Sequence, residues 1–334
     1  MKRLSREAFD RARQFLKTQA RPLDRAMFEY RFESAPAEAV LAELVVFQNE
    51  DGGFGHALEP DVRTPSSSAL ATGIGLRILQ ELDTPSDHPM VSQAVNFLLS
   101  TFDHGANVWR VVPYDTNDYP HAGWWHDEDN PNKRTTEGRL TRTFDGFQVI
   151  PRAELVALLH HFVQLRLGTL RIPIALTKWL EDLAEHTVKS IEDLEALGSG
   201  GGDTLVYALR LAETDALPQA LKDRLLARLR DVVPEAVEHN PQKWDTYCIL
   251  PLKIAPSPQS LVADLLWDDL QAHLDYQIDH QSPAGIWEPS WTWGDAYPEA
   301  WEQAKLEWRG HLTLETLTTL EAFSRLCQSK RIDL

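Results

Sequence analysis

Two carboxylates, Glu59 and Asp61, lie in a short polar segment, residues 56–61, between two stretches with helical periodicity. Carboxyl groups can donate or accept a proton, so this pair could perform general acid–base chemistry. His56 begins the segment and could contact a ligand. The acids could instead cap and solvate the following helix, since negative charge is favourable at a helix N-terminus. We predict Glu59 and Asp61 as catalytic residues and keep helix capping as the alternative.

A second candidate segment, residues 119–129, combines two histidines, two tryptophans and three acids. The tandem Trp124 and Trp125 suit a platform for a sugar ring or a hydrocarbon. The histidines could bind a metal with a nearby acid, but their spacing matches no standard metal motif. We predict His121, Trp124 and Trp125 as substrate contacts, with a purely structural lid as the alternative.

The densest aromatic segment spans residues 285–297. Trp291 and Trp293 follow a proline in what reads as an extended loop, where they are free to face a cavity. Aromatic faces stabilise cations by ~0.5–2 kcal/mol each. We predict Trp291, Trp293 and Tyr297 as ligand contacts.

A turn motif occurs twice in the same register, at Gln48 to Phe54 and at Gln281 to Trp287. Each copy reads Gln, three residues, Gly, one residue and an aromatic. Glycine tolerates the positive φ of a tight turn, and the Gln amide can bind free backbone groups at a helix end. Two copies in register indicate a repeated helical-hairpin architecture.

These residues resemble the Gln/Trp repeat of triterpene cyclases and protein prenyltransferase β-subunits. The resemblance covers roughly residues 36–82 and 258–327, and Gly105 to Trp109 is similar to a degraded copy. Pro120 to Trp125 looks like an element of short bacterial members of that superfamily. The resemblance implies an α/α toroid, in which helical hairpins form inner and outer rings around a central cavity.

In such a toroid the connections between helices gather at the ends of the barrel. Residues 56–61, the long irregular loop at 113–146 and the loop 288–297 would then meet at one mouth. The resemblance therefore implies a single small-molecule pocket, with the loop 113–146 as a lid. We expect this pocket to be lined by Glu59, Asp61, Trp124, Trp125, Trp291 and Trp293.

The sequence contains one candidate zinc site. Prenyltransferases hold zinc through an Asp, a Cys and a His, and Asp245, Cys248 and His311 occur in a comparable order. The Asp and Cys here are one residue further apart than in that family. We therefore predict no metal and no cofactor, and assign His311 as a substrate contact. The Asp-x-Asp-Asp motif of triterpene cyclases is also absent.

The composition limits the function classes. The 334 residues carry a net charge of −17, which argues against nucleic acid and anionic membrane as partners. Two cysteines make no disulfide framework, and the N-terminal residues do not resemble a signal peptide. We expect one domain over residues 1–334, in the cytoplasm, with a small-molecule ligand. Nothing in the sequence indicates the oligomeric state.

Helical periodicity dominates the chain and predicts an all-α fold. The expected helices are 5–18, 36–48, 66–82, 88–101, 151–167, 173–190, 203–213, 218–238, 258–279, 298–307 and 310–327, with a short strand at 108–112.

Three functions fit these features. The first is a terpenoid cyclase- or prenyltransferase-like enzyme with a cavity for an apolar, isoprenoid-type molecule. The second is a carbohydrate-active α/α-barrel enzyme that uses tryptophan platforms and paired carboxylates, with Glu288 or Asp295 completing a pair across the mouth. The third is a non-catalytic binding or scaffold protein.

Overall fold

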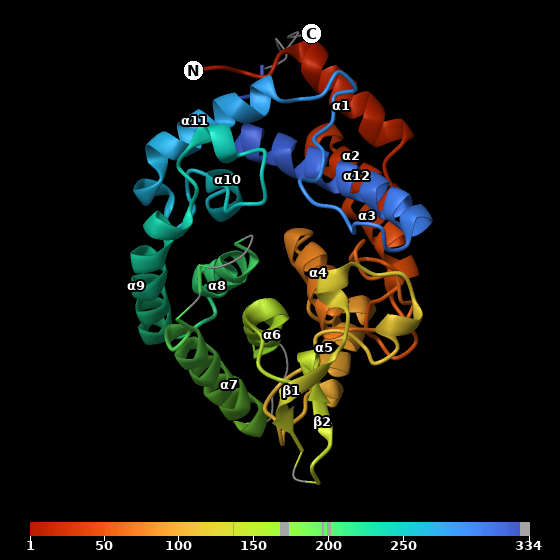
Figure 1. The fold of residues 1–334 in the computed structure, drawn as a ribbon, viewed down its shortest axis with the longest axis vertical. Helices are drawn as coiled ribbons and strands as arrows, with labels where there is room; N and C mark the ends of the chain where they lie inside the picture. Colours follow the sequence, from red (N-terminus) through yellow and green to blue (C-terminus); the bar gives the residue numbers. More distant parts are fainter. Residues whose placement is uncertain (136, 168–173, 196, 199–201, 328–334) are drawn as a thin grey trace.

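The computed structural model describes residues 1–135, 137–167, 174–195, 197–198 and 202–327 (Figure 1). Most of these residues are helical, which confirms the predicted all-α class. The α-helices are α1 (Arg6–Thr18), α2 (Pro22–Glu33), α3 (Ala37–Leu44), α4 (Ala69–Glu81), α5 (Pro89–Thr101), α6 (Val149–Leu167), α7 (Ile174–Glu192), α8 (Asp203–Glu213), α9 (Gln219–Ala236), α10 (Pro251–Ile254), α11 (Trp267–Asp279) and α12 (Pro298–Ala322). The 3₁₀ turns are η1 (Val45–Phe47), η2 (Thr116–Asp118), η3 (Gly123–Trp125), η4 (Thr143–Asp145), η5 (Pro241–Lys243) and η6 (Ala263–Leu265).

Serine side chains cap α1 and α4, near the starts expected at residues 5 and 66. The Ser5 hydroxyl accepts from the backbone N–H of Ala8 at the start of α1, and the Ser68 hydroxyl accepts from Ala71 at the start of α4. These bonds satisfy N–H groups that have no partner within the helix.

The structure corrects three expectations. The segments 298–307 and 310–327 form one helix, α12, because Gly310 does not break it. A Cβ at Gly310 would lie 3.0 Å from Ala20 and from the Asp24 carboxylate, so the glycine instead allows close packing on the α1–α2 region. Helix α2 was not predicted, because its apolar residues are spread around the helix rather than along one face.

The third correction concerns the strands. Residues 108–112 form only an isolated bridge at Val108. The irregular loop expected at 113–146 instead contains an antiparallel hairpin of β1 (Asp129–Arg134) and β2 (Leu140–Arg142). Its strands are polar and mostly exposed, so they lack the alternation of apolar residues that would have predicted them.

The helices alternate between two layers (Figure 1). Helices α4, α6, α8 and α10 follow one another as packed neighbours, and α5, α7, α9 and α11 each pack on the outside of this series. Helix α12 packs against both α1 and α2. A continuous apolar core fills the space between the layers.

The two ends of the described chain are joined. Leu4 and Leu326 form a parallel bridge, and the buried Arg325 guanidinium donates to the Lys2 carbonyl at 2.7 Å and to Asp275 at 2.6 Å. The first and last helices therefore belong to one packed unit.

The two copies of the turn motif make the same contacts. The amide of Gln48 donates to the carbonyls of Gly52 (2.9 Å) and Met90 (3.0 Å). The amide of Gln281 donates to those of Gly285 (3.0 Å) and Ala8 (3.1 Å). Each Gln thus closes its own turn and ties it to another helix, α5 for the first copy and α1 for the second.

The glycines of the motif are required by conformation and by space. Gly52 has φ +90° and Gly285 has φ +84°. A Cβ would lie 2.5 Å from the Gln93 carbonyl oxygen at the first position and 2.5 Å from the Arg11 backbone at the second. Only glycine fits both requirements without strain.

A third version of the turn covers Asp103 to Trp109. Asn107, with φ +57°, takes the place of the glycine two residues before the aromatic. The Arg152 guanidinium donates to the Asn107 carbonyl at 2.9 Å, a contact that the Gln amide makes in the other two copies. The degraded copy expected at Gly105 to Trp109 therefore has the backbone form of the motif, with Asn107 rather than Gly105 at the strained position.

Candidate active site

The acidic segment 56–61 lies beside the segment 119–122. The two are joined by an antiparallel bridge between Val62 and His121. The N–H of Arg63 donates to the Pro120 carbonyl at 3.1 Å, and the N–H of Ala122 donates to the Asp61 carbonyl at 2.9 Å. Backbone hydrogen bonds thus fix two segments that are distant in sequence.

Asp61 is buried and held by tryptophans. Its Oδ1 accepts the indole N–H of Trp293 at 2.8 Å and that of Trp308 at 2.8 Å. The pKa of the Asp61 carboxyl is raised, because burial outweighs the indole N–H groups of Trp308, Trp293 and Trp291, which act to lower it. Because these donors stabilise the carboxylate, we assign the negative charge of the site to Asp61.

The Glu59 carboxyl, in contrast to Asp61, favours its protonated form. Its side chain keeps some accessible surface, but the surrounding protein and, next, the Asp61 charge raise its pKa to about 8. Arg21 opposes the shift and does not cancel it. The Glu59 carboxyl therefore holds a proton near neutral pH beside a charged neighbour. Two carboxyl groups whose environments separate their pKa values are typical of acid–base sites.

The structure brings several of the predicted residues together. Trp125, Trp291, Trp293 and Trp308 share one apolar cluster with Ala122, Trp301 and Ala304. The rings of Trp291 and Trp308 meet edge to face, 5.0 Å apart. Segments around residues 61, 125 and 293 thus converge as the sequence suggested.

Other predicted residues lie at the edge of this cluster or outside it. The buried His121 ring contacts the exposed Tyr297 ring at 5.6 Å. Trp124 is 49% exposed, and the exposed His56 bonds to Asn49 at 2.7 Å within its own turn.

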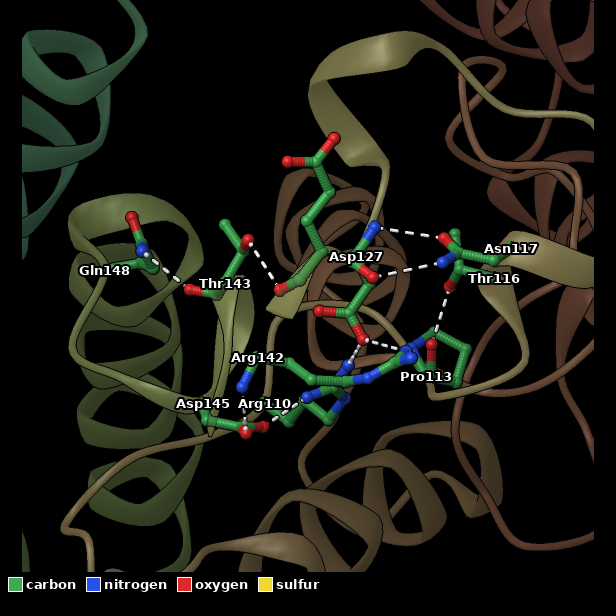
Figure 2. Close-up of polar contacts among 10 residues, drawn as sticks. Arg110, Pro113, Thr116, Asn117, Asp127, Arg142, Thr143, Asp145 and Gln148 are labelled. Carbon is green, nitrogen blue, oxygen red and sulfur yellow. Dashed lines mark hydrogen bonds and ion pairs between the residues drawn. The ribbon is translucent and has the colours of Figure 1, made fainter. Parts of the chain in front are cut away.

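The histidines of the segment 119–129 are bonded to each other. His121 Nε2 lies 2.9 Å from His126 Nδ1, and the two rings stack. The nearby Asp127 is fully buried and forms ion pairs with Arg110 and, at 2.9 Å, with Arg142 (Figure 2). Asn117 exchanges two hydrogen bonds of 3.0 Å with the Asp127 backbone. These contacts tie the hairpin to the preceding loop and engage Asp127, one of the acids beside the two histidines.

The residues considered for zinc are placed on different elements. The Cys248 thiol donates to the Lys243 carbonyl at 3.5 Å in the turn after η5, whereas His311 lies on α12. Among the residues that the structure describes, no group of three or more His, Cys, Asp and Glu is arranged to hold a metal ion.

Sequence reasoning missed a charged cluster on the inner helices. The Arg77 guanidinium of α4 and the Arg210 guanidinium of α8 each donate to Oε1 of Glu154, on α6, at 2.8 Å. Tyr207 of α8 lies beside them, and burial followed by the Glu154 charge raises its pKa. In the sequence, the sign of this cluster is that Arg77 and Glu154 are charged residues within the apolar helices 69–81 and 149–167.

A second set of charges lies at the start of α2 and on α12. Arg63 forms a two-pronged ion pair with Glu307 at 2.9 and 3.1 Å, and Arg21 pairs with Asp24 at 2.7 Å. Burial lowers the pKa of His311, so its imidazole is neutral near pH 7.

The two sets influence each other electrostatically, since the Arg77 charge acts to lower the pKa of His311. The Glu59 charge contributes to the raised pKa of Tyr207, and Glu315 of α12 contributes to the raised pKa of Arg77. Glu59, Tyr207 and His311 keep accessible surface although burial sets the direction of their pKa shifts. Glu59 also lines a small pocket together with Leu58, Val62 and Ser66.

A pocket of about 440 Å³ lies elsewhere, between α1, α2 and the chain before Cys327. None of the predicted site residues lines it. Its charged groups include Arg13 and Glu33, which form an ion pair at 2.5 Å. We assign it no catalytic role, because it lacks the separated acid–base pair.

No protein-family model, curated protein or solved structure matches the chain. No helix among the described residues is long and apolar enough to cross a membrane. The function is therefore inferred from the chemistry of the site.

Proposed function

We propose that the protein is an enzyme in which Glu59 transfers a proton to or from a polar, sugar-type small molecule inside an α/α toroid. The observation that carries this proposal is the Glu59 carboxyl, with its pKa of about 8, next to an Asp61 carboxylate anchored by two indole N–H groups. A partly accessible carboxylic acid that stays protonated near neutral pH is suited to general acid catalysis.

Three features support the toroid. Inner and outer helices alternate along the chain, the two ends are joined, and the turn motif at 281–287 contacts α1 in the way that the motif at 48–54 contacts α5. A toroid would place the concave faces of α4, α6, α8 and α12 around one space.

The charged interior favours a polar substrate. Arg77, Glu154, Arg210 and Tyr207 present hydrogen-bonding groups rather than an apolar wall, and tryptophans lie beside the acid pair. Aromatic rings next to convergent polar groups are typical of sugar-binding sites.

The surroundings of Glu59 favour proton transfer at carbon, as in a lyase or an epimerase, over glycoside hydrolysis. Hydrolysis needs a second carboxylate across the substrate. Of the two acids expected for that role, Glu288 forms an ion pair with Arg309 at 2.8 Å, and Asp295 is exposed. The neutral His311 imidazole and the Tyr207 hydroxyl are the remaining groups that can exchange a proton.

The isoprenoid-type reaction is the second candidate, and the tryptophan cluster around Asp61 favours it. Trp291, Trp293 and Trp308 would stabilise a carbocation through their ring faces. Glu59 would then supply the proton that starts the reaction.

One experiment separates these functions. The protein is incubated in D₂O with neutral hexoses, with hexuronates and, separately, with farnesyl diphosphate, and the products are examined by NMR. Deuterium at a sugar carbon supports the proposal, and a cyclised diphosphate that carries deuterium supports the second candidate. Glu59→Gln should abolish either reaction, whereas Glu38→Gln, at an exposed position on α3, should not. Absence of turnover with every compound would overturn both and favour a scaffold.

A further inference from the structure

The arginines of the inner cluster share one acid. Arg77 and Arg210 approach Glu154 from α4 and α8, the helices on either side of α6, and both bond to the same oxygen at 2.8 Å. One carboxylate cannot neutralise two guanidinium groups, so the three residues together carry a net positive charge.

Both guanidinium groups have donors to spare. A guanidinium has five N–H donors, and each of these two uses one of them in the hydrogen bonds found among the described residues. The Arg77 side chain is 29% exposed and that of Arg210 is 31% exposed, whereas Glu154 is 3% exposed. The arginines thus face accessible space and the acid lies behind them.

One carboxylate oxygen of Glu154 lacks a hydrogen-bond donor among the described residues. Its Oε2 is buried and has no hydrogen-bond partner among the described residues. A buried acceptor without a donor is uncommon in a purely structural ion pair. The acid therefore fixes the position of both guanidinium groups through Oε1 and leaves their remaining N–H groups uncommitted.

Three further groups define the electrostatics. The Arg210 guanidinium lies over the Tyr207 ring, 5.0 Å from its centroid. The Glu315 charge of α12 acts on Arg77 and Glu213 interacts with Arg210, but both acids are exposed and neither forms an ion pair among the described residues. At the two arginines an incoming anion would compete with solvated carboxylates, not with a fixed partner.

We propose that Arg77 and Arg210 form a subsite for an oxyanion on the substrate, and that this group is the carboxylate of a sugar acid. Two guanidinium groups held side by side can bind a carboxylate through paired N–H donors. This inference rests on the proposed function only for the identity of the sugar. Binding of the oxyanion does not require that Glu59 act in catalysis.

Calorimetric titration tests the subsite directly. The probes are D-glucuronate, D-glucose as the neutral match, and inorganic phosphate, all at the same ionic strength. We expect glucuronate to bind roughly tenfold more tightly than glucose. Phosphate binding equal to or tighter than that of glucuronate would identify a phosphorylated substrate instead. Equal affinity for glucuronate and glucose would overturn the subsite.

Two substitutions should change the affinity in opposite directions. Arg210→Gln removes a cation and should weaken glucuronate binding by roughly tenfold. Glu154→Gln keeps an oxygen acceptor for both guanidinium groups but removes the competing charge, so it should strengthen binding. Circular dichroism shows whether each variant is folded, and Glu315→Gln provides a second charge-removing variant at an exposed position. Weaker binding in Glu154→Gln and Glu315→Gln, with both folded, would contradict the proposal.

Glu59→Gln separates this inference from the proposed function. The variant should lose turnover and keep its affinity for glucuronate. If glucuronate binds but no reaction is found, the subsite stands and the catalytic proposal fails. If a reaction of a neutral sugar depends on Glu59 but glucuronate binds no more tightly than glucose, the subsite fails and the catalytic proposal stands.

Discussion

Asp61 accepts the indole N–H of Trp293 at 2.8 Å, although the two residues are 232 positions apart in the chain. This bond connects the acidic segment after the first turn motif to the aromatic loop after the second. It also holds a negative charge next to Glu59, which is the second-largest cause of the raised pKa of that carboxyl.

Replacing Asp61 by Asn should lower the pKa of Glu59. The substitution removes the Asp61 charge and keeps an oxygen that can accept the indole N–H groups. We expect a shift on the order of one pH unit toward the ordinary value, with burial still raising the pKa. Carboxyl ¹³C NMR of Asp61→Asn and the parent protein measures this shift, and an unchanged Glu59 resonance would show that Asp61 does not act on it.

Glu59 should make the stability of the protein depend on pH. Its pKa rises from 4.5 to about 8 on folding, so the folded state binds the proton more tightly than the unfolded state does. The stabilisation is complete below pH 4.5 and is lost as the pH rises from there to about 8.

Glu59→Gln should therefore be more stable than the parent protein at pH 8, with the difference vanishing toward pH 4.5. We expect a gain of ~1–2 kcal/mol at pH 8, below the full linkage value because Glu59 keeps solvent contact. Urea unfolding at several pH values measures it, with Glu38→Gln as the matched control. A gain that is independent of pH would show that the pKa of Glu59 is not raised.

Valine at Gly52 should destabilise the fold strongly. The position has φ +90°, and the new Cβ would lie 2.5 Å from the Gln93 carbonyl oxygen. We expect a loss of ~2–4 kcal/mol, and a similar loss for Gly285→Val. A Cβ at Gly123 meets nothing within 4 Å, so Gly123→Ala is the control. Thermal melting compares the three variants, and equal melting temperatures would show that the turn motif is dispensable.

The purified protein should contain far less than stoichiometric zinc. Cys248 bonds within its own turn, and Asp127 is engaged by two arginines. Elemental analysis after purification without chelator measures the content. Stoichiometric zinc that is lost in Cys248→Ala or His311→Ala would favour the prenyltransferase resemblance.

The parts of the fold that depend on local chemistry could be predicted from the sequence. The turn motif needs a glycine at positive φ and an amide side chain, and both copies have them at a fixed spacing. The caps at Ser5 and Ser68 are likewise local. Helix α2 escaped prediction because its stability comes from packing against α3 and α12 rather than from a regular apolar stripe.

The candidate site could be predicted only in part. The polar and aromatic composition of three loops indicated that they meet, and Asp61, Trp125 and Trp293 do lie together. Trp308 could not be assigned, because its position on a helix gave no sign that its N–H reaches Asp61. Arg77, Glu154 and Arg210 were missed for the same reason, since the bond between helices exists only once α4, α6 and α8 are packed side by side.

Two neighbouring tryptophans provide the sharpest test of how the acid pair is held. The indole N–H of Trp308 donates to Asp61 at 2.8 Å, whereas that of Trp291 is buried without a hydrogen-bond partner among the described residues. The rings touch, so Trp→Phe at either position removes similar apolar contact. Trp308→Phe removes a direct donor to Asp61, which should raise the pKa of Asp61 and, by weakening its charge, lower that of Glu59. The Trp291 indole also acts to lower the pKa of Asp61, but its effect is smaller and it makes no direct hydrogen bond, so Trp291→Phe should shift both pKa values less. We expect Trp308→Phe to cost about 1–2 kcal/mol more in the free energy of unfolding than Trp291→Phe.

Urea unfolding of the two variants gives the stability, and carboxyl NMR gives the pKa values. If both variants shift the Glu59 resonance equally, the tryptophans act through packing alone and the hydrogen bond to Trp308 does not set the charge of Asp61.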